Sequence, residues 1–153
     1  MMHLESTKYQ FFIMSKRTIL ILEDDFTRIE RFKVVLNSIG TGFELKVWRN
    51  AKKMISELDR YIQMSVLVSL DHDLNPVKSG GSDPGDGLDV ARFFASRTPV
   101  CPIIIHSSNI NRSEMMMGEL ELAGWKVKRV GPIGDDWIEI DWAMLASKLI
   151  SKQ

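Results

Sequence analysis

Several features that mark secreted, membrane and nucleic-acid-binding proteins are missing from this sequence. It has one cysteine, Cys101, so no disulfide can form within the chain, which suits a reducing compartment. Its 20 basic and 20 acidic residues cancel, which leaves no positive excess to neutralise nucleic-acid phosphates. No apolar run approaches the roughly 20 residues of a transmembrane helix, and the apolar stretch 9–14 is too short for the core of a signal peptide. We therefore expect a cytoplasmic protein that binds neither nucleic acid nor membrane.

The hydrophobic content, by contrast, is sufficient for a folded core. Hydrophobic residues make up 44% of the 153 residues, a composition and length that suit one globular domain. Residues 1–13 show no clear period, and the stretch MSKRTILILEDD, beginning at Met14, is typical of a natural start before a first strand. We expect residues 1–17 to be an N-terminal extension, of which residues 1–13 are dispensable, and residues 18–153 to form the single domain.

Short apolar runs alternate with helical stripes along the rest of the chain. The runs predict strands at 18–22, 43–48, 65–70, 100–105 and 125–130, the fourth of them broken by Pro102 near its start. Apolar residues three and four apart predict helices at 27–39, 51–61, 88–95 and 110–123, and a last helix, capped by Asp135 or Asp136, that runs to about Ile150. Such alternation indicates parallel strands with right-handed crossovers. The predicted fold class is α/β, a doubly wound five-stranded parallel sheet with helices on both faces.

Polar residues follow three of the predicted strands. Because the carboxyl ends of parallel strands meet at the edge of the sheet where this architecture binds ligands, we expect these residues to converge. The glycine-rich loop 75–87 overhangs the same edge, and its backbone N–H groups could hold an anion. The converging residues are Asp24 and Asp25 after the first strand, Asp71, His72 and Asp73 after the third, and His106, Ser107, Ser108 and Asn109 after the fourth.

Four motifs resemble the receiver domains of response regulators. They are ILILEDDF with its acidic pair, VLVSLDHDLNP, DGLDVARFF and PIIIHSS, in that order along the chain. The resemblance covers about residues 18–150 and implies the flavodoxin-like receiver fold with strand order 2-1-3-4-5. It places Asp71 at the phosphoacceptor position and Ser107 at the position of the hydroxyl switch residue.

The sequence also departs from ordinary receivers. The lysine that receivers carry before a proline after strand five is replaced by Gly131, and Lys128 and Arg129 would have to be reoriented to substitute for it. His72 and His106 stand where receivers usually have apolar residues. The segments LDHDL and HSSN are similar to those of the cyclic-phosphate-processing receiver-like proteins, which implies a role in processing cyclic phosphates.

The acidic residues are candidates for binding a divalent cation. Three carboxylates at one edge repel each other, and one would be protonated unless a cation joins them. Their hard oxygen ligands suit Mg²⁺ or Mn²⁺, with Asp24, Asp25 and Asp71 as the metal ligands. The alternative is that Asp24 or Asp25 only caps the first helix.

The remaining residues are candidates for catalysis and phosphate binding. We expect Asp71 or Asp73 to act as base or nucleophile, and His106 to protonate a leaving oxygen. Ser107, Asn109 and His72 are expected to bind phosphate oxygens. Other interpretations stay open: Asp73 as a turn residue, Asn109 as a helix cap, and the histidines as packed residues. Strand alternation argues against both histidines entering the pocket, since His72 is out of phase with Asp71 and His106 with Ser107.

Two classes of function follow. The first is a metal-dependent phosphoesterase whose substrate is a phosphorylated or cyclic-phosphate small molecule. The second is an atypical receiver, phosphorylated on Asp71 by a histidine kinase or a small phosphodonor, or a binding module that works without phosphorylation. The first is favoured because LDHDL and HSSN exceed what a receiver needs, while Gly131 removes a residue that a receiver uses.

Overall fold

The structure is a computed structural model that describes residues 17–76 and 80–153. The predicted N-terminal extension therefore lies, apart from Arg17, outside the described residues, as do residues 77–79 of the loop after strand three. None of the described helices is both long and apolar enough to cross a membrane.

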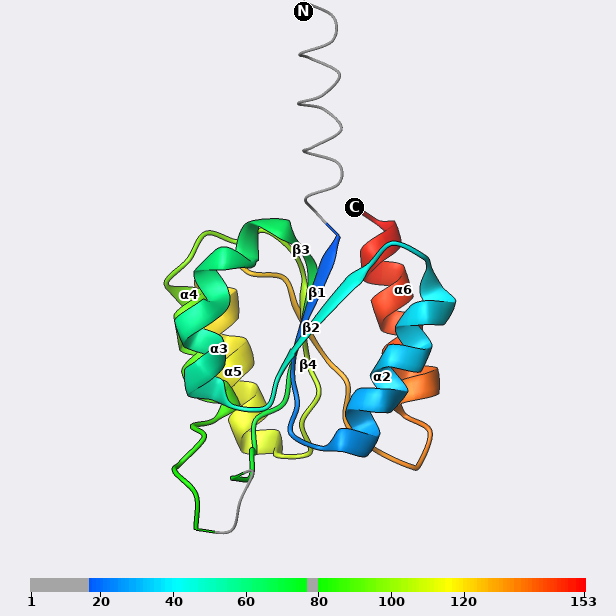
Figure 1. The fold of residues 1–153 in the computed structure, drawn as a ribbon. Coiled ribbons are helices and arrows are strands. Elements are labelled where there is room, and N and C mark those ends of the chain that lie inside the picture. The colour runs from blue at the N-terminus through cyan, green and yellow to red at the C-terminus, as the bar shows by residue number, and fades with distance from the viewer. Residues whose placement is uncertain (1–16, 77–79) are drawn as a thin grey trace, which may run out of the picture.

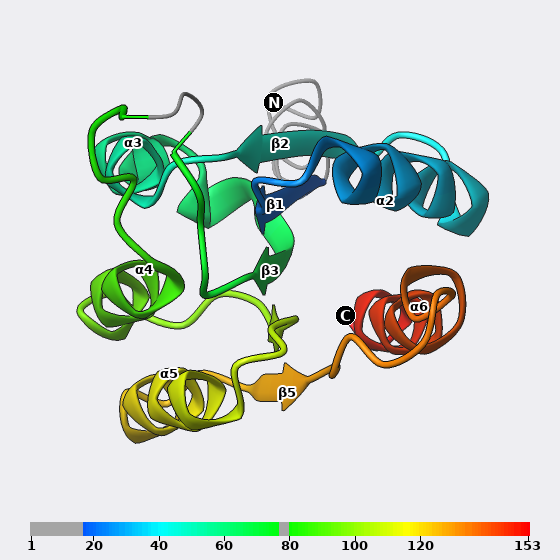
Figure 2. The same ribbon diagram turned by 90° about the horizontal axis from the view of Figure 1, so that it is seen from below.

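The predicted sheet is confirmed in the number, direction and order of its strands. Five parallel strands lie in the order β2-β1-β3-β4-β5, and Figure 2 shows them nearly end-on with helices on both faces. Their bounds are β1 Thr18–Leu22, β2 Glu44–Trp48, β3 Ser65–Leu70, β4 Ile103–Ile105 and β5 Val127–Arg129. The fourth and fifth strands are shorter than predicted. Pro102 has no N–H to donate to a neighbouring strand, and β4 begins directly after it.

Helices α3, α4 and α5 cover one face of the sheet, and α2 and α6 cover the other (Figure 1). The predicted second helix ends early and continues as two 3₁₀ turns, Leu58–Arg60 and Ile62–Met64. The predicted last helix starts later than Asp135 or Asp136 and opens with a π-helical turn, Ile138–Trp142. The bounds are α2 Phe26–Ile39, α3 Ala51–Glu57, α4 Gly87–Ala95, α5 Ile110–Leu122 and α6 Ala143–Ser151.

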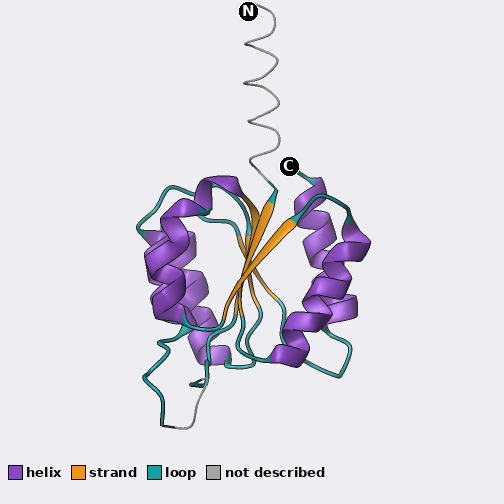
Figure 3. Cartoon of the chain, viewed as in Figure 1, coloured by secondary structure: helices purple, strands orange, loops and turns teal. Residues whose placement is uncertain are grey.

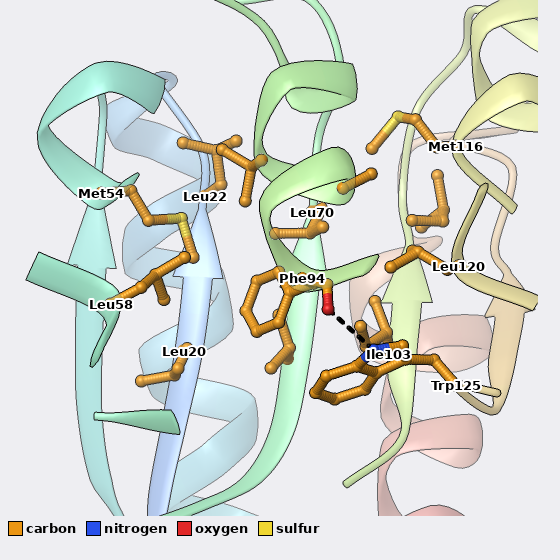
Figure 4. Packing of buried hydrophobic residues seen from close by; sticks show 14 of the residues in the cluster. Leu20, Leu22, Met54, Leu58, Leu70, Phe94, Ile103, Met116, Leu120 and Trp125 are labelled. Atoms are coloured by element: carbon orange, nitrogen blue, oxygen red, sulfur yellow. Dashed lines mark hydrogen bonds between the residues drawn. The ribbon is translucent and has the colours of Figure 1, made fainter. Parts of the chain in front are cut away.

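The side chains of each strand alternate between two hydrophobic layers. Leu20, Leu22, Val68 and Leu70 of β1 and β3 pack under α3, α4 and α5, whereas Ile19, Ile21 and Leu67 pack under α2 and α6. Val66 also belongs to the second layer, at the start of β3 where its register against β1 shifts. Figure 4 shows part of the first layer, in which the indole N–H of Trp125 donates to the carbonyl oxygen of Phe94 at 2.9 Å. Each fully buried large side chain of these layers stabilises the fold by about 1.5–3 kcal/mol relative to its exposed state.

The alternation continues past the carboxyl ends of three strands. Backbone hydrogen bonds from Glu23 to Trp48, from Asp71 to Leu22 and from His106 to Leu70 extend the sheet by one residue each. Each of these three residues lies two positions after a strand residue whose side chain faces α2 and α6. Because side chains alternate along a strand, all three project toward the same two helices. The described parts of the loop between β3 and α4, residues 71–76 and 80–86, extend beyond this edge of the sheet (Figure 3). The strand phase therefore places an acid, the predicted phosphoacceptor and a histidine on one face.

Candidate functional site

A polar pocket lies at the carboxyl edge of the sheet. Four of the predicted site residues line it, together with two arginines that the sequence did not single out. Residues His72, His106, Ser107 and Asn109 do not line it. Its lining is Asp24, Asp25, Phe26, Arg28, Arg49, Asp71, Asp73, Asn75, Pro76 and Ser108.

Asp71 is the most buried acid of this pocket, with 6% of its surface exposed. Its Oδ1 accepts a hydrogen bond from the backbone N–H of His72 at 2.7 Å. Its Oδ2 lies 4.0 Å from Nη1 of Arg28, which is an ion-pair distance but too long for a hydrogen bond. Burial raises the pKa of Asp71 to about 6, because its surroundings do not fully compensate the ionised carboxylate.

Asp24 and Asp25 each combine a structural contact with a place in the pocket. Asp25 caps α2, since its Oδ1 accepts from the backbone N–H of Arg28 at 2.9 Å. Asp24 Oδ2 accepts from the backbone N–H of Asn75 at 2.8 Å, which ties the loop after β1 to the loop after β3. Burial is the main cause that raises the pKa of Asp24. Asp25 therefore both caps α2 and lines the pocket, so its role as a helix cap does not exclude it as a cation ligand.

Beneath the pocket, four buried side chains form a hydrogen-bonded chain. His106 Nε2 lies 3.1 Å from Glu23 Oε2, and His106 Nδ1 lies 2.6 Å from Ser69 Oγ. The same Ser69 oxygen accepts from the indole N–H of Trp142 at 3.0 Å. Every donor has an acceptor when Ser69 donates to Nδ1 and His106 is the neutral tautomer that donates from Nε2. His106 is fully buried and therefore supports the pocket from below.

Glu23 was missed as a site residue, although it is fully buried next to the acidic pair. Its Oε1 accepts from the backbone N–H groups of Asp24 and Asp25, both at 3.0 Å. Burial alone would raise the pKa of Glu23, but the hydrogen bonds from His106 and from the Asp25 backbone hold it below its ordinary value. Glu23 therefore fixes the position of the acidic loop.

Glu23, Asp71 and His106 also form a compact cluster, in which each offers one ligand atom and these atoms lie within 4.8 Å of one another. Glu23 and His106, however, have no exposed surface, and both ring nitrogens and both carboxylate oxygens are already in hydrogen bonds. A hydrated Mg²⁺ keeps several of its waters and needs room for them. Asp24, Asp25 and Asp71 do not form such a compact group in the described residues, but they line the open pocket above it, where a hydrated ion has room.

His72 lies on the other side of the sheet from His106. It is 5% exposed, and its Nδ1 lies 2.8 Å from Asp73 Oδ1. Its Nε2 lies 3.7 Å from Asp86 Oδ2 and has no hydrogen-bond partner among the described residues. Close packing explains the burial: a Cβ added to Gly87 would lie 2.0 Å from the carbonyl oxygen of Asp71. The glycine therefore lets α4 rest against the backbone that carries the site.

Ser107 and Asn109 lie just outside the pocket. The Ser107 hydroxyl, 1% exposed as a residue, accepts from the backbone N–H of Asn109 at 3.1 Å. Asn109 caps α5 by accepting from the backbone N–H of Arg112 at 3.1 Å, and its side chain also donates to Asp73 at 3.4 Å. Asn109 is thus the helix cap that the sequence offered as an alternative. Phosphate binding by Ser107 or Asn109 stays a prediction.

The two candidates for the missing lysine are directed elsewhere. Lys128 is exposed on β5, and Arg129 donates to the carbonyl oxygen of Ser107 at 2.7 Å. Positive charge reaches the pocket instead from Arg28 on α2 and from Arg49 after β2. Arg49 donates twice to the carbonyl oxygen of Asp24, at 3.0 and 2.8 Å, and so stabilises the acidic loop.

The sheet order, the acidic pair and the buried aspartate after β3 define a receiver-type protein. Solved structures agree: a response regulator receiver domain from Rhodospirillum rubrum matches with TM-score 0.64 at 15% identity, covering 89% of this chain and 94% of that one. The phosphorylated cyanobacterial phytochrome response regulator RcpA matches with TM-score 0.65 at 14% identity, covering 90% and 96%. The Mn²⁺-bound response regulator Rcp1 matches with TM-score 0.59 at 18% identity, covering 87% and 94%. At these identities the likeness establishes the fold.

A family match gives a narrower assignment than the fold does. Residues 19–122 match the model of the cyclic-phosphate processing receiver domain, and the chain belongs to that family. A comparison with curated proteins found no match.

Proposed function

We propose that this protein binds a divalent cation and a phosphoryl group at the Asp71 pocket and processes a cyclic phosphate or a related phosphoester. The observation that carries the proposal is the environment of Asp71, a buried carboxylate with a pKa raised to about 6 in a pocket shared with three other acids and two arginines. Carboxylates and arginines side by side suit a ligand that combines a cation with an anion. The family match supports cyclic phosphates as the substrate class.

The acids fit Mg²⁺ or Mn²⁺ by their donor chemistry. Asp24, Asp25 and Asp71 would hold the ion through hard oxygen ligands, which would compensate the carboxylate that burial destabilises. Such an ion, when bound, polarises a phosphoryl group and activates water. Glu23 would contribute by holding the backbone of the acidic loop.

The other residues have distinct tasks in this proposal. Asp73, whose side chain is 65% exposed, lies between the ring of His72 and the amide of Asn109, which orient it at the rim as a candidate base. Asp71 is the alternative base or nucleophile. His106 would have to leave Glu23 and Ser69 to protonate a leaving oxygen, so it supports the site in the geometry described here.

The test is turnover of 2′,3′- and 3′,5′-cyclic nucleotides with Mg²⁺ or Mn²⁺. We expect metal-dependent ring opening, lost in Asp71→Asn and retained in Asp141→Asn, a matched substitution of an exposed acid on the π-helical turn. Turnover by a folded Asp71→Asn variant that equals that of the unsubstituted protein would contradict the assignment.

A second candidate function is an atypical receiver phosphorylated on Asp71. It is favoured by the position of Asp71 directly after β3, beside the acidic pair, and by the phosphorylated regulator among the similar structures. A histidine kinase would be its partner. Incubation with acetyl phosphate and Mg²⁺ should then add the mass of one phosphoryl group, and Asp71→Asn should abolish the gain. An unchanged mass would argue against this function.

A further inference from the structure

Arg28 presents an unusual combination of position and unused donors. It lies in the first turn of α2, and its Nη1 is 3.8 Å from Glu23 Oε2 and 4.0 Å from Asp71 Oδ2. Both distances exceed hydrogen-bond range. Among the described residues, its guanidinium makes no hydrogen bond, although its side chain is only 34% exposed. A guanidinium carries five N–H donors in a fixed fork, so this one is ready to accept an anion.

Trp137 holds this guanidinium in place. The guanidinium carbon lies 5.5 Å from the centroid of the Trp137 ring, a cation–π distance. Trp137 is itself 3% exposed and stacks on His106 at 5.9 Å, while its ring meets Phe32 edge to face. The platform under Arg28 is therefore rigid. Its donors are positioned beside Asp71 before any ligand arrives, which lowers the entropy cost of binding.

Two of the other nearby cations, Arg49 and Arg129, donate to backbone carbonyl oxygens, although the buried Nε of Arg129 has no partner among the described residues. Arg49 donates from two nitrogens to the Asp24 carbonyl oxygen, and Arg129 donates to the Ser107 carbonyl oxygen. Lys128 projects from β5 as an exposed residue. Of these four cations, Arg28 is the one that combines pocket lining, an ion-pair distance to Asp71 and a free fork of donors.

We infer that Arg28, held by Trp137, binds the non-bridging oxygens of the phosphoryl group at Asp71 and replaces the strand-five lysine that receivers use. This inference rests on the proposed phosphoryl site and assigns its anion-binding residue. The positive charge thus comes from Arg28 at the start of α2, close to the acidic pair, while Gly131, two residues after β5, carries none. A guanidinium can contact two phosphoryl oxygens at once, whereas an ammonium acts as a point charge. The site should therefore favour ligands with two accessible non-bridging oxygens.

Beryllofluoride, which mimics a phosphoryl group on an aspartate, is the probe for this inference. Its binding in the presence of Mg²⁺ is followed by ¹⁹F NMR, and Mg²⁺ binding without the anion is followed by calorimetry. The variants are Arg28→Gln and Arg28→Lys, with Lys33→Gln as the matched control, an exposed cation on the same helix that pairs with Glu30. Arg, Lys and Gln have similar helix propensities, and the Asp25 cap uses the backbone N–H of Arg28, so α2 should persist.

Opposite effects on the two ligands are expected. Arg28→Gln should weaken beryllofluoride binding by about tenfold to a hundredfold, the loss of charge-assisted hydrogen bonds. Arg28→Lys should recover part of it, and Lys33→Gln should leave it unchanged. Mg²⁺ alone should bind Arg28→Gln at least as tightly as the unsubstituted protein, because a positive charge near Asp71 has been removed.

The outcomes separate the two claims. If the unsubstituted protein does not bind Mg²⁺, the proposed cation site is refuted, and the inference falls with it. If Mg²⁺ binds but the unsubstituted protein takes up no beryllofluoride, the proposed phosphoryl site is refuted, and the inference falls with it. If the unsubstituted protein takes up beryllofluoride and Arg28→Gln does so with undiminished affinity, the inference alone is overturned. A parallel loss of Mg²⁺ and beryllofluoride binding in Arg28→Gln would also overturn it, since this would indicate a structural role for Arg28.

Discussion

Replacing Asp71 with asparagine should stabilise the protein at neutral pH, even though Asp71 lies at the centre of the proposed site. The pKa of Asp71 is raised by burial from 3.8 to about 6, so the folded state binds its proton more tightly than the unfolded state does. Stability therefore falls as the pH rises from about 4 to 6, and the full penalty applies above pH 6. Asparagine remains neutral at every pH and keeps an oxygen that can accept from the backbone N–H of His72.

The size of the effect follows from the difference in pKa. A difference of roughly two units corresponds to about 3 kcal/mol at pH 7.5, because each unit is worth 1.36 kcal/mol. At pH 4.5 the unfolded carboxylate is mostly ionised and the folded one mostly protonated, so the penalty is about 1 kcal/mol. The stability advantage of Asp71→Asn should thus shrink by about 2 kcal/mol between the two pH values. The full advantage of about 3 kcal/mol at pH 7.5 corresponds to a Tm increase of about 6–12 °C for a domain of this size.

Urea unfolding followed by tryptophan fluorescence at pH 4.5 and 7.5 measures this difference. Asp141→Asn, which neutralises an exposed acid, is the control and should change stability little at either pH. Mg²⁺ should narrow the gap at pH 7.5, since it stabilises the unsubstituted protein in proportion to its binding. A gap of equal size at both pH values, or an Asp71→Asn variant less stable at pH 7.5, would show that the Asp71 carboxylate is not destabilised by burial.

Three further predictions concern the scaffold. Gly87→Ala places a Cβ 2.0 Å from the carbonyl oxygen of Asp71, so thermal unfolding should show a loss of about 1–3 kcal/mol, whereas Gly118→Ala on the open face of α5 should gain up to about 1 kcal/mol. Asn109→Ala removes the cap of α5 and should cost about 1 kcal/mol in urea unfolding, and an unchanged midpoint would contradict the cap. Trp142→Phe removes a hydrogen bond to a buried serine hydroxyl and should cost about 1–3 kcal/mol in the same assay, with a loss near zero as the refuting result.

The sheet was predictable because its signals are local. Each strand is a short apolar run, and each connection carries a helical stripe, so element order and fold class follow from periods along the chain. The position of Asp71 was predictable for the same reason, since it directly follows β3. The break at the start of the fourth strand was predictable as well, because Pro102 has no N–H to donate to a neighbouring strand, and β4 begins directly after it.

The parts of the site that escaped prediction depend on contacts between distant segments. Glu23 meets His106 across 83 residues, and only strand phase places both on one face. The free guanidinium of Arg28 depends on Trp137, which lies in the turn before the last helix. In the sequence, an arginine in the first turn of a helix is typical of an exposed surface residue. No neighbouring residue indicates the aromatic ring that packs beneath it.

The proposed cation site at Asp71 is best tested by titration with Mg²⁺ or Mn²⁺ at pH 7.5, comparing the unsubstituted protein with Asp71→Asn and Asp141→Asn. Calorimetry, or the loss of the free Mn²⁺ signal in electron paramagnetic resonance, measures the binding. We predict one bound ion per chain, with affinity lost or at least tenfold weaker in Asp71→Asn and unchanged in Asp141→Asn. No binding by the unsubstituted protein, or equal binding by Asp71→Asn, would contradict it.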